Sequence, residues 1–183
     1  RVVPINPNRA TVAGLPAIAD IRQAGAIDVA ILAVPVTLIE SSISACAQAG
    51  VRACIIVTAG FAEIGEEGAA LQQRVVAIAR ASDMRIVGPN CMGVINSHHQ
   101  MALTSSLVMD KWDLAPGGVG LISQSGALMV SMFDRARADG IRFSVCVSIG
   151  NQCDLDVCDF FEHLISDPRT AVITMYVEGF VDA

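Results

Sequence analysis

The segment from Gly120 to Leu128 has the residue types of an anion-binding turn. An apolar run ends at Ser123, gives way to small and hydroxyl-bearing residues, and resumes at helical spacing after Gly126. This pattern predicts a strand leading into a helix, whose first turn favours an anion such as phosphate through unpaired N–H groups and the helix dipole. We expect the hydroxyls of Ser123 and Ser125 to add donors and Gly126 to let a ligand approach the backbone. A capped turn without a ligand is the structural alternative.

Other loops that follow strand-like runs carry further groups able to bind a ligand, because parallel sheets bind ligands at the carboxyl ends of their strands. Arg9 could hold a phosphate, although an exposed loop arginine is the plainer interpretation. The segment Gly88–Gly93 places Asn90 and the thiol of Cys91 in a special backbone, and a structural turn is its alternative. Glu178 ends a late strand-like run, either as a functional carboxylate or as a solvated exit residue. The remaining such loops contain Val34-Pro35, Val57-Thr58-Ala59 and Gly150-Asn151.

Several motifs of other protein classes are missing from the sequence. It has no Walker loop, and no glycine fingerprint of a dinucleotide fold follows a strand. The six cysteines form no CxxC pair and no metal-type cluster with the histidines, so we expect no metal site. His98 and His99 are adjacent in a polar segment and are predicted to lie on the surface, and His163 falls in a helical pattern as a structural residue.

Composition indicates an α/β protein with buried parallel strands. Of the 183 residues, 53% are hydrophobic and only 4% aromatic, so Ala, Val, Ile and Leu must build the core. A net charge of −6 argues against a general nucleic-acid surface. No apolar run approaches the roughly 18 residues of a membrane span, and the free-cysteine pattern favours a reduced, cytoplasmic setting.

Strand-like runs alternate with helical patterns along the chain, which predicts βαβ units and a parallel sheet. The expected strands are Val2–Ile5, Val29–Val34, Ala53–Val57, Arg85–Val87, Val119–Ile122, Phe143–Ile149 and Ala171–Val177. The expected helices are Leu15–Ile21, Thr37–Ala49, Glu66–Ser82, Leu128–Ala138 and Asp156–Ser166. Gly50 and Gly140 suit helix C-termini, and either Asp154 or Asp156 suits the N-cap of the last helix.

The alternation breaks between Gly93 and Gly118, where the sequence is polar and irregular. We interpret this segment as a crossover between two domains, with a boundary near Lys111 to Pro116. The chain begins at Arg1 without a methionine and begins and ends near core-type strands, so we expect it to be a piece of a longer protein.

Taken together, the loops resemble those of the NDP-forming acyl-CoA synthetases, the superfamily that includes the α subunit of succinyl-CoA synthetase. The resemblance covers nearly the whole chain, and two of its phrases, Ala59–Glu63 and Gly88–Gly93, look most like the ADP-forming acetate branch. The phrases that carry it, in order, are Val34-Pro35, Thr58–Glu63, Gly88–Gly93, Ser123–Leu128, Ser148–Gln152 and Val177–Gly179.

The resemblance implies two domains. Residues 1–111 would form a Rossmann-like CoA-binding domain without its first strand and glycine-rich loop, and residues 112–183 a truncated flavodoxin-like ligase domain. It implies that Arg9 contacts CoA phosphates. It further implies that the CoA is lined by Val34, Pro35, Val57, Thr58 and Ala59. The substrate and thiol end of the site would lie near Gly88, Pro89, Asn90, Cys91, Gly150 and Asn151.

The family reaction runs through an acyl phosphate and a phosphorylated histidine. The resemblance implies that Ser123, Gln124, Ser125, Gly126 and Ala127 hold this phosphate, and that Glu178 pairs with the other imidazole nitrogen. The catalytic histidine would lie beyond Ala183, so the chain alone should be inactive. ATP or ADP and Mg²⁺ would be bound by an ATP-grasp domain or β subunit in a cytoplasmic oligomer. Val130 replaces a tyrosine of succinate enzymes, which makes succinate doubtful and an apolar or aromatic acid plausible.

Two other functions are compatible with these patterns. The same architecture occurs fused to protein acetyltransferases as a non-catalytic CoA- or nucleotide-sensing module. A plain nucleotide-binding Rossmann protein is the other, and the missing dinucleotide fingerprint argues against it.

Overall fold

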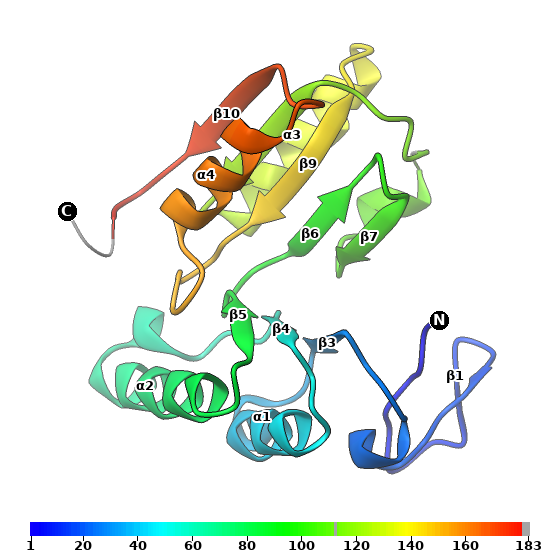
Figure 1. The fold of residues 1–183 in the computed structure, drawn as a ribbon, viewed down its shortest axis with the longest axis vertical. Coiled ribbons are helices and arrows are strands. Elements are labelled where there is room, and N and C mark those ends of the chain that lie inside the picture. Colours follow the sequence, from blue (N-terminus) through cyan, green and yellow to red (C-terminus); the bar gives the residue numbers. More distant parts are fainter. Residues whose placement is uncertain (112, 181–183) are drawn as a thin grey trace.

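The computed structural model describes residues 1–111 and 113–180. They form two α/β units, drawn one above the other in Figure 1, each built around its own sheet. The prediction of an α/β fold with a Rossmann-like parallel-sheet unit followed by a partial flavodoxin-like unit is confirmed. The two units meet where the chain leaves the carboxyl ends of their parallel strands.

The first unit contains a three-stranded parallel sheet in the order β3-β4-β5. These strands are Val29–Leu32, Ala53–Ile56 and Arg85–Val87. Helices α1 (Ile39–Gln48) and α2 (Glu66–Arg80) lie together below the sheet in Figure 1. Alternate strand residues face these helices, and they form one apolar core with helix residues, including Leu32, Ile39, Ile43, Cys54, Ile56, Val75 and Ile86.

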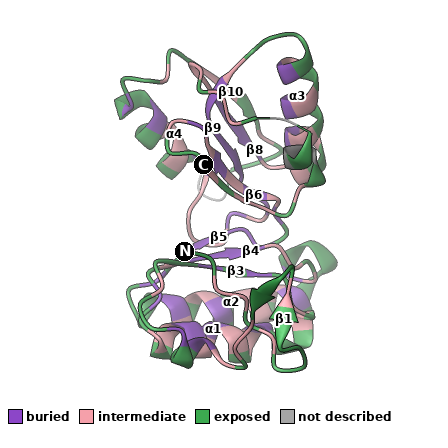
Figure 2. Ribbon diagram, turned by 90° about the vertical axis from the view of Figure 1, so that its right-hand side faces the viewer, coloured by how far each residue is buried: buried purple, intermediate pink, exposed green. Residues whose placement is uncertain are grey.

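The second unit contains a five-stranded sheet in the order β10-β8-β9-β6-β7. The parallel part comprises β8 (Val119–Ser123), β9 (Phe143–Ser148) and β10 (Val172–Tyr176). Helices α3 (Gly126–Ala138) and α4 (Val157–Ser166) cover opposite faces of this sheet, as Figure 2 shows. Successive β8 residues therefore enter different cores, Leu121 beside Met129 of α3 and Ile122 beside Leu164 of α4.

The segment expected to be an irregular crossover instead forms a hairpin. Strands β6 (Gly93–Asn96) and β7 (Met101–Thr104) are antiparallel to each other, and β6 pairs antiparallel with β9. The hairpin thus belongs to the second sheet, although it precedes the expected boundary near residue 111. Its strands have only four residues each and contain polar positions, which is why their pattern reads as a loop. The boundary itself stays a prediction.

The first 23 residues differ from two predictions. Val2–Ile5 makes only an isolated bridge between Ile5 and Ile18, and Leu15–Ile21 is not a helix. Instead β1 (Thr11–Val12) and β2 (Leu15–Pro16) form a small hairpin, because Pro16 interrupts the helical pattern and Ala17 N–H donates to Ala10 O. Short 3₁₀ helices occupy Ile21–Gln23, Val36–Leu38, Ala62–Ile64 and Leu107–Asp110.

The helix ends follow the expected capping chemistry. Gly50 and Gly140 have φ angles of 72° and 85° just after α1 and α3, as predicted. Asp156 is the N-cap of α4, and its carboxylate accepts from the Cys158 and Asp159 N–H groups. The Asp159 carboxylate in turn accepts from the Asp156 N–H, which completes a capping box. Asp154, the alternative, instead binds Arg85 at 2.9 Å and accepts from Ile86 N–H.

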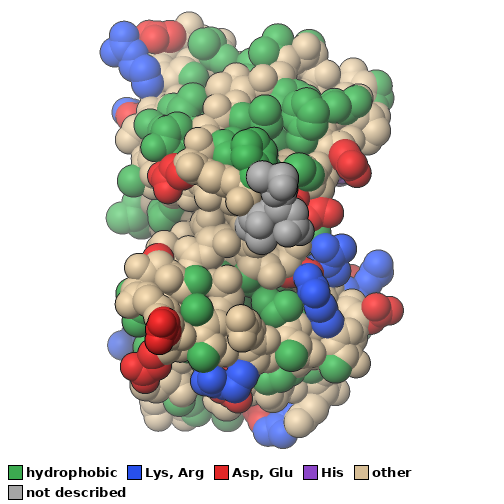
Figure 3. Space-filling view, turned by 90° about the vertical axis from the view of Figure 1, so that its left-hand side faces the viewer, with side chains coloured by type: hydrophobic (Ala, Val, Ile, Leu, Met, Phe, Trp, Pro, Cys, Tyr) green, Lys and Arg blue, Asp and Glu red, His purple; other side chains and the backbone are tan. Residues whose placement is uncertain are grey.

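Apolar side chains gather on the face of the second unit that carries β10, as the space-filling view in Figure 3 shows. Val172 is 56% and Met175 46% exposed there, and among the described strands only β8 pairs with β10. No helix in the described ranges combines the length and apolar character needed to cross a bilayer.

Replacement of the α4 cap tests this account of the fold. We expect Asp156→Ala to lower the free energy of unfolding by about 1 kcal/mol, because two first-turn N–H groups lose their acceptor. Thermal or urea unfolding measures the change. Glu162→Ala, on the exposed side of the same helix, is the control; equal stability of the two variants would contradict the capping role.

Candidate functional site

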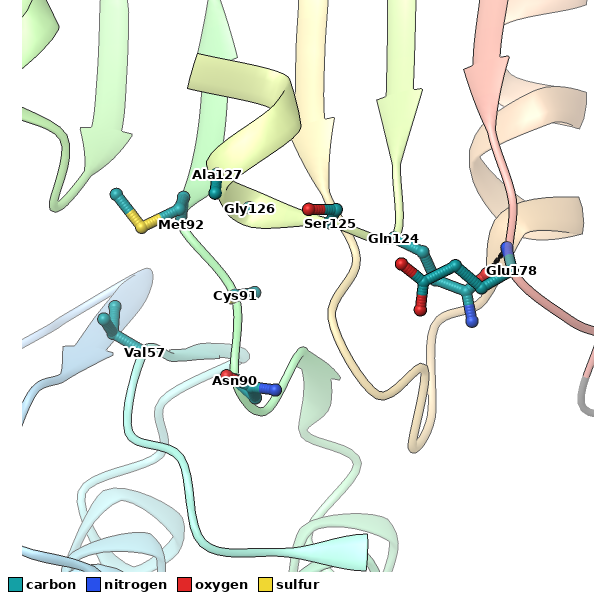
Figure 4. Close-up of a pocket in the computed structure, with 9 residues that line it drawn as sticks. All are labelled: Val57, Asn90, Cys91, Met92, Gln124, Ser125, Gly126, Ala127 and Glu178. Atoms are coloured by element: carbon teal, nitrogen blue, oxygen red, sulfur yellow. Dashed lines mark hydrogen bonds between the residues drawn. The ribbon is translucent and has the colours of Figure 1, made fainter. Parts of the chain in front are cut away.

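A cavity of about 380 Å³ lies between the two units, at the carboxyl ends of parallel strands. Its walls come from the ends of β4, β5, β8 and β10, so four separate chain passages converge there (Figure 4). The lining residues are Val57, Asn90, Cys91, Met92, Gln124, Ser125, Gly126, Ala127 and Glu178. All but Met92 were candidates from the sequence, drawn from both of the predicted domains.

The upper wall is the start of α3. Ser125 is the N-cap, and its Oγ accepts from Leu128 N–H at 3.3 Å. Gly126 and Ala127 line the cavity, and N–H groups in the first turn of a helix have no partner within that helix. The Ser123 hydroxyl differs from the expectation that it donates to a bound anion. It is buried and donates to Ser125 O at 2.7 Å, so it supports the turn and does not face a ligand.

Gln124 and Gln152 hold the carboxyl end of β10 against this turn. The Gln124 Oε1 atom accepts from the N–H groups of Glu178 and Gly179, the latter at 3.1 Å. Gln152, buried in the loop after β9, donates from Nε2 to Gly179 O at 3.2 Å and accepts from Val157 N–H through Oε1. The Glu178 side chain then reaches across Gln124 into the cavity, as Figure 4 shows.

Met92 forms part of the wall opposite Glu178. Its N–H donates to Ser148 Oγ at 3.0 Å, which fixes the chain between β5 and β6 against the end of β9. A Cβ atom on Gly126 would lie 2.5 Å from Met92 Cγ and 3.3 Å from Ser148 Oγ. Glycine therefore permits the helix start to approach this wall closely, in addition to exposing its amide.

The lower wall is the turn after β5. The Gly88–Pro89 peptide is cis, and Asn90 has a φ of 56°, so the turn has the special backbone that the two glycines and proline predict. Asn90 N–H donates to Thr58 O at 3.0 Å, and Thr58 Oγ1 donates to Val34 O at 2.7 Å. These bonds join the two loops expected to line CoA, after β3 and β4, to the loop after β5 that is expected to lie at its thiol end.

Cys91 is packed inside this wall, 3% exposed, with Sγ 3.3 Å from Ile56 O. Burial raises the pKa of its thiol to about 11, since the thiolate would lose its hydration. The thiol is therefore neutral at pH 7.

Several other candidates do not line the cavity. Arg9 is exposed in the loop before β1, and Val130 packs against the α3 core. Eight further candidates lie behind the lining residues or in neighbouring loops: Val34, Pro35, Thr58, Ala59, Gly88, Pro89, Gly150 and Asn151. His98 Nε2 lies 3.0 Å from Gly117 O, while His99 and His163 are exposed, and none of the three reaches the cavity. In the described ranges no group of His, Cys, Asp or Glu is arranged to hold a metal ion.

Comparisons with known proteins identify the two units. Residues 1–97 match the family described as "CoA binding domain", and residues 116–183 match "Succinyl-CoA ligase like flavodoxin domain". The chain belongs to the NDP-forming acyl-CoA synthetase superfamily. It is 37% identical over its whole length to the ADP-forming acetate–CoA ligase II subunit alpha of Pyrococcus furiosus, of which it covers 39%.

Two further members of the superfamily are similar. A trans-feruloyl-CoA synthase of an unknown prokaryotic organism is 38% identical over 97% of this chain and 26% of its own length. The structure of the Ca. Korarchaeum cryptofilum acetyl-coenzyme A synthetase 1 with phosphate and ADP has a TM-score of 0.87 and 32% identity, over 98% of this chain and 38% of that one. This chain thus spans two fifths or less of these relatives.

Thiol labelling tests the assignment of Cys91 to the wall. At pH 8 iodoacetamide should modify the exposed Cys158 first and leave Cys91 largely unlabelled, because the buried thiol is neutral. Peptide mass spectrometry of the native protein measures both sites. Labelling of Cys91 as fast as Cys158, in protein that remains folded, would contradict this placement.

Proposed function

We propose that the complete protein carrying this chain is an ADP-forming acid–CoA ligase, with this chain supplying part of the CoA site and the phosphate-facing helix. One observation supports it above the others: the cavity joins the end of the CoA-binding unit to the exposed start of α3. A CoA thioester on the lower wall and a phosphoryl group on the upper wall would share one space. Phosphate and ADP in a relative's structure are compatible with this assignment.

The proposed reaction proceeds in three transfers. A phosphate oxygen attacks the thioester carbonyl, the C–S bond breaks, and CoA leaves as a thiol with the proton that phosphate gives up. A histidine nitrogen attacks the phosphorus of the acyl phosphate, and the free acid leaves as its carboxylate. The terminal oxygen of ADP then attacks the phosphohistidine, the N–P bond breaks, and ATP forms.

This chain's residues have two roles in the proposal. The Gly126 and Ala127 amides stabilise the phosphoryl group, which carries about two negative charges when it is on the histidine. The Glu178 carboxylate accepts a hydrogen bond from the other imidazole nitrogen and so fixes the tautomer that attacks. Arg9 is proposed to reach CoA phosphates, although it does not line the cavity.

The remaining components are proposed to lie outside this chain. They are the phosphorylated histidine, an ATP-grasp domain or β subunit that binds the nucleotide with Mg²⁺, and the contacts of an oligomer. The Pyrococcus relative is named as a subunit alpha, which supports a partner of this kind. Relatives of nearly equal identity are named for acetate and for trans-ferulate, so we leave the acid open among small, apolar and aromatic carboxylic acids.

The assay of the complete protein with CoA, ATP and a panel of acids tests the ligase proposal. We expect acid-dependent release of ADP and a phosphoenzyme that is labile in acid, as a phosphohistidine is. CoA binding without turnover or phosphorylation would overturn the ligase and favour the sensing module instead. Binding of NAD rather than CoA, measured by calorimetry, would indicate a nucleotide-binding Rossmann protein.

A single substitution tests the role of Glu178. Glu178→Gln should lower the rate of phosphohistidine formation by about a hundredfold, because the neutral amide accepts a hydrogen bond from the imidazole without the negative charge that makes the ring nucleophilic. Rapid-quench measurement of the phosphoenzyme gives this rate. Glu162→Gln, an exposed carboxylate on α4, is the control, and equal rates in both variants would contradict the proposed pairing.

A further inference from the structure

The carboxylate of Glu63 joins the two units. Its Oε1 atom accepts from Gly60 N–H, in the loop after β4 of the first unit. Its Oε2 atom accepts from Asn151 Nδ2, in the loop after β9 of the second unit. One side chain thus contacts one loop of each unit, although it does not line the cavity itself.

Asn151 is held on both sides by residues of the first unit. Besides the bond to Glu63, its Nδ2 donates to Gln72 Oε1 at 3.2 Å, and its Oδ1 accepts from Asn90 Nδ2 at 3.4 Å. Its backbone N–H donates to Pro89 O at 3.0 Å. Asn90 lines the cavity, so the chain of contacts runs from Glu63 through Asn151 to the lower wall.

The charge of Glu63 fixes this arrangement. Partial burial would raise the pKa of the carboxyl, but hydrogen bonds from Asn151 and the Gly60 N–H outweigh it and lower the pKa below its ordinary value. Glu63 is therefore ionised at neutral pH and can only accept hydrogen bonds. The Asn151 amide must then present its Nδ2 group to Glu63 and its oxygen to Asn90.

Both ends of the contact are anchored in the structure. The fully buried Phe61 ring holds the turn that carries Glu63 in the first core. Gly150, with a φ of 52°, packs so closely that a Cβ atom would lie 2.1 Å from Pro89 O. Each loop is thus held by its own packing, and the bond from Asn151 to Glu63 joins the two loops at a fixed spacing.

We propose that Glu63 is a positioning residue, which locks the Gly150–Gln152 loop to the first unit and so sets the separation of the two cavity walls. The inference rests on the proposed function in one respect: the separation matters because CoA would occupy one wall and the acyl phosphate the other. A loss of the lock should slow acyl transfer to CoA and leave phosphorylation of the histidine by ATP unchanged.

A pair of substitutions tests the lock through its donors and acceptors. Glu63→Gln places an NH₂ group against one of two donors, and Asn151→Asp places a second carboxylate against Glu63, so each single change breaks the contact. In the double variant E63Q/N151D, the glutamine NH₂ donates to the new carboxylate and its oxygen accepts from Gly60 N–H. Gln72 can rotate its amide to donate, and the net charge of the pair is unchanged.

Two readouts are measured on the complete protein. In hydrogen–deuterium exchange, each single variant should exchange faster in peptides containing Gly60 and Asn151, and the double variant should return to the wild-type rate. In kinetics, each single variant should lower kcat for CoA-dependent acyl transfer by about tenfold, with the rate of phosphoenzyme formation from ATP unchanged, and the double variant should recover. Glu67→Gln, an exposed carboxylate on the first turn of α2, is the matched control.

The outcomes separate the inference from the proposed function. Faster exchange in the single variants without recovery in the double variant would overturn the lock, as would exchange at the wild-type rate in all variants. Equal losses in acyl transfer and phosphorylation would overturn the positioning role. If the wild-type protein forms no phosphoenzyme, the ligase proposal fails, and the recovery of exchange still decides whether the lock exists.

Discussion

Three backbone N–H groups after β9 donate to carbonyl oxygens at the end of β5: Asn151 to Pro89, Cys153 to Gly88 and Leu155 to Ile86. This docking is the contact on which the site depends, since it brings the carboxyl ends of two separate sheets to one place. The close fit of Gly150 against Pro89 O leaves no room for a side chain there. The bond from Gln152 to Gly179 O and the bond from Asn151 to Glu63 both come from the same loop after β9.

The charges of the cavity bear on the anion that it would bind. Among the described residues that line it there is no lysine or arginine, and the one charged group, Glu178, is negative. A helix N-terminus stabilises a negative charge by typically 0.3–1 kcal/mol, up to about 2 kcal/mol when partly buried, which a nearby carboxylate offsets. A phosphoryl group on an imidazole avoids this conflict, because the other ring nitrogen gives Glu178 a hydrogen-bond donor. This pairing supports the proposed phosphohistidine.

Most residues of the candidate site could be predicted from the sequence, because glycine, proline and helix-capping residues favour a small number of backbone conformations. The strand-to-helix turn at Ser123–Gly126 and the special backbone at Gly88–Asn90 were both predicted from residue types. The β6–β7 hairpin was missed, since strands of four residues with polar positions give little periodic signal and gain their stability from pairing with β9. The helix expected at Leu15–Ile21 was wrong because a few apolar residues around Pro16 mimic helical spacing.

The supporting side chains were beyond sequence reasoning for a different reason. Glu63, Met92 and Gln152 all lie inside phrases that carried the family resemblance, which was the only signal available. Their roles arise from contacts between residues up to 88 positions apart, and such contacts have no local pattern. The same holds for the hydroxyl of Ser123, whose direction depends on the packing of the turn rather than on its residue type.

The proposed function requires one cavity to hold both CoA and the phosphoryl group. A crystal structure of the complete protein with CoA and phosphate would show whether it does. We expect phosphate within hydrogen-bonding distance of the Gly126 and Ala127 amides, with the CoA sulfur in the same cavity beside Asn90. Phosphate bound elsewhere, or CoA lying with its sulfur outside the cavity, would rule out a shared cavity.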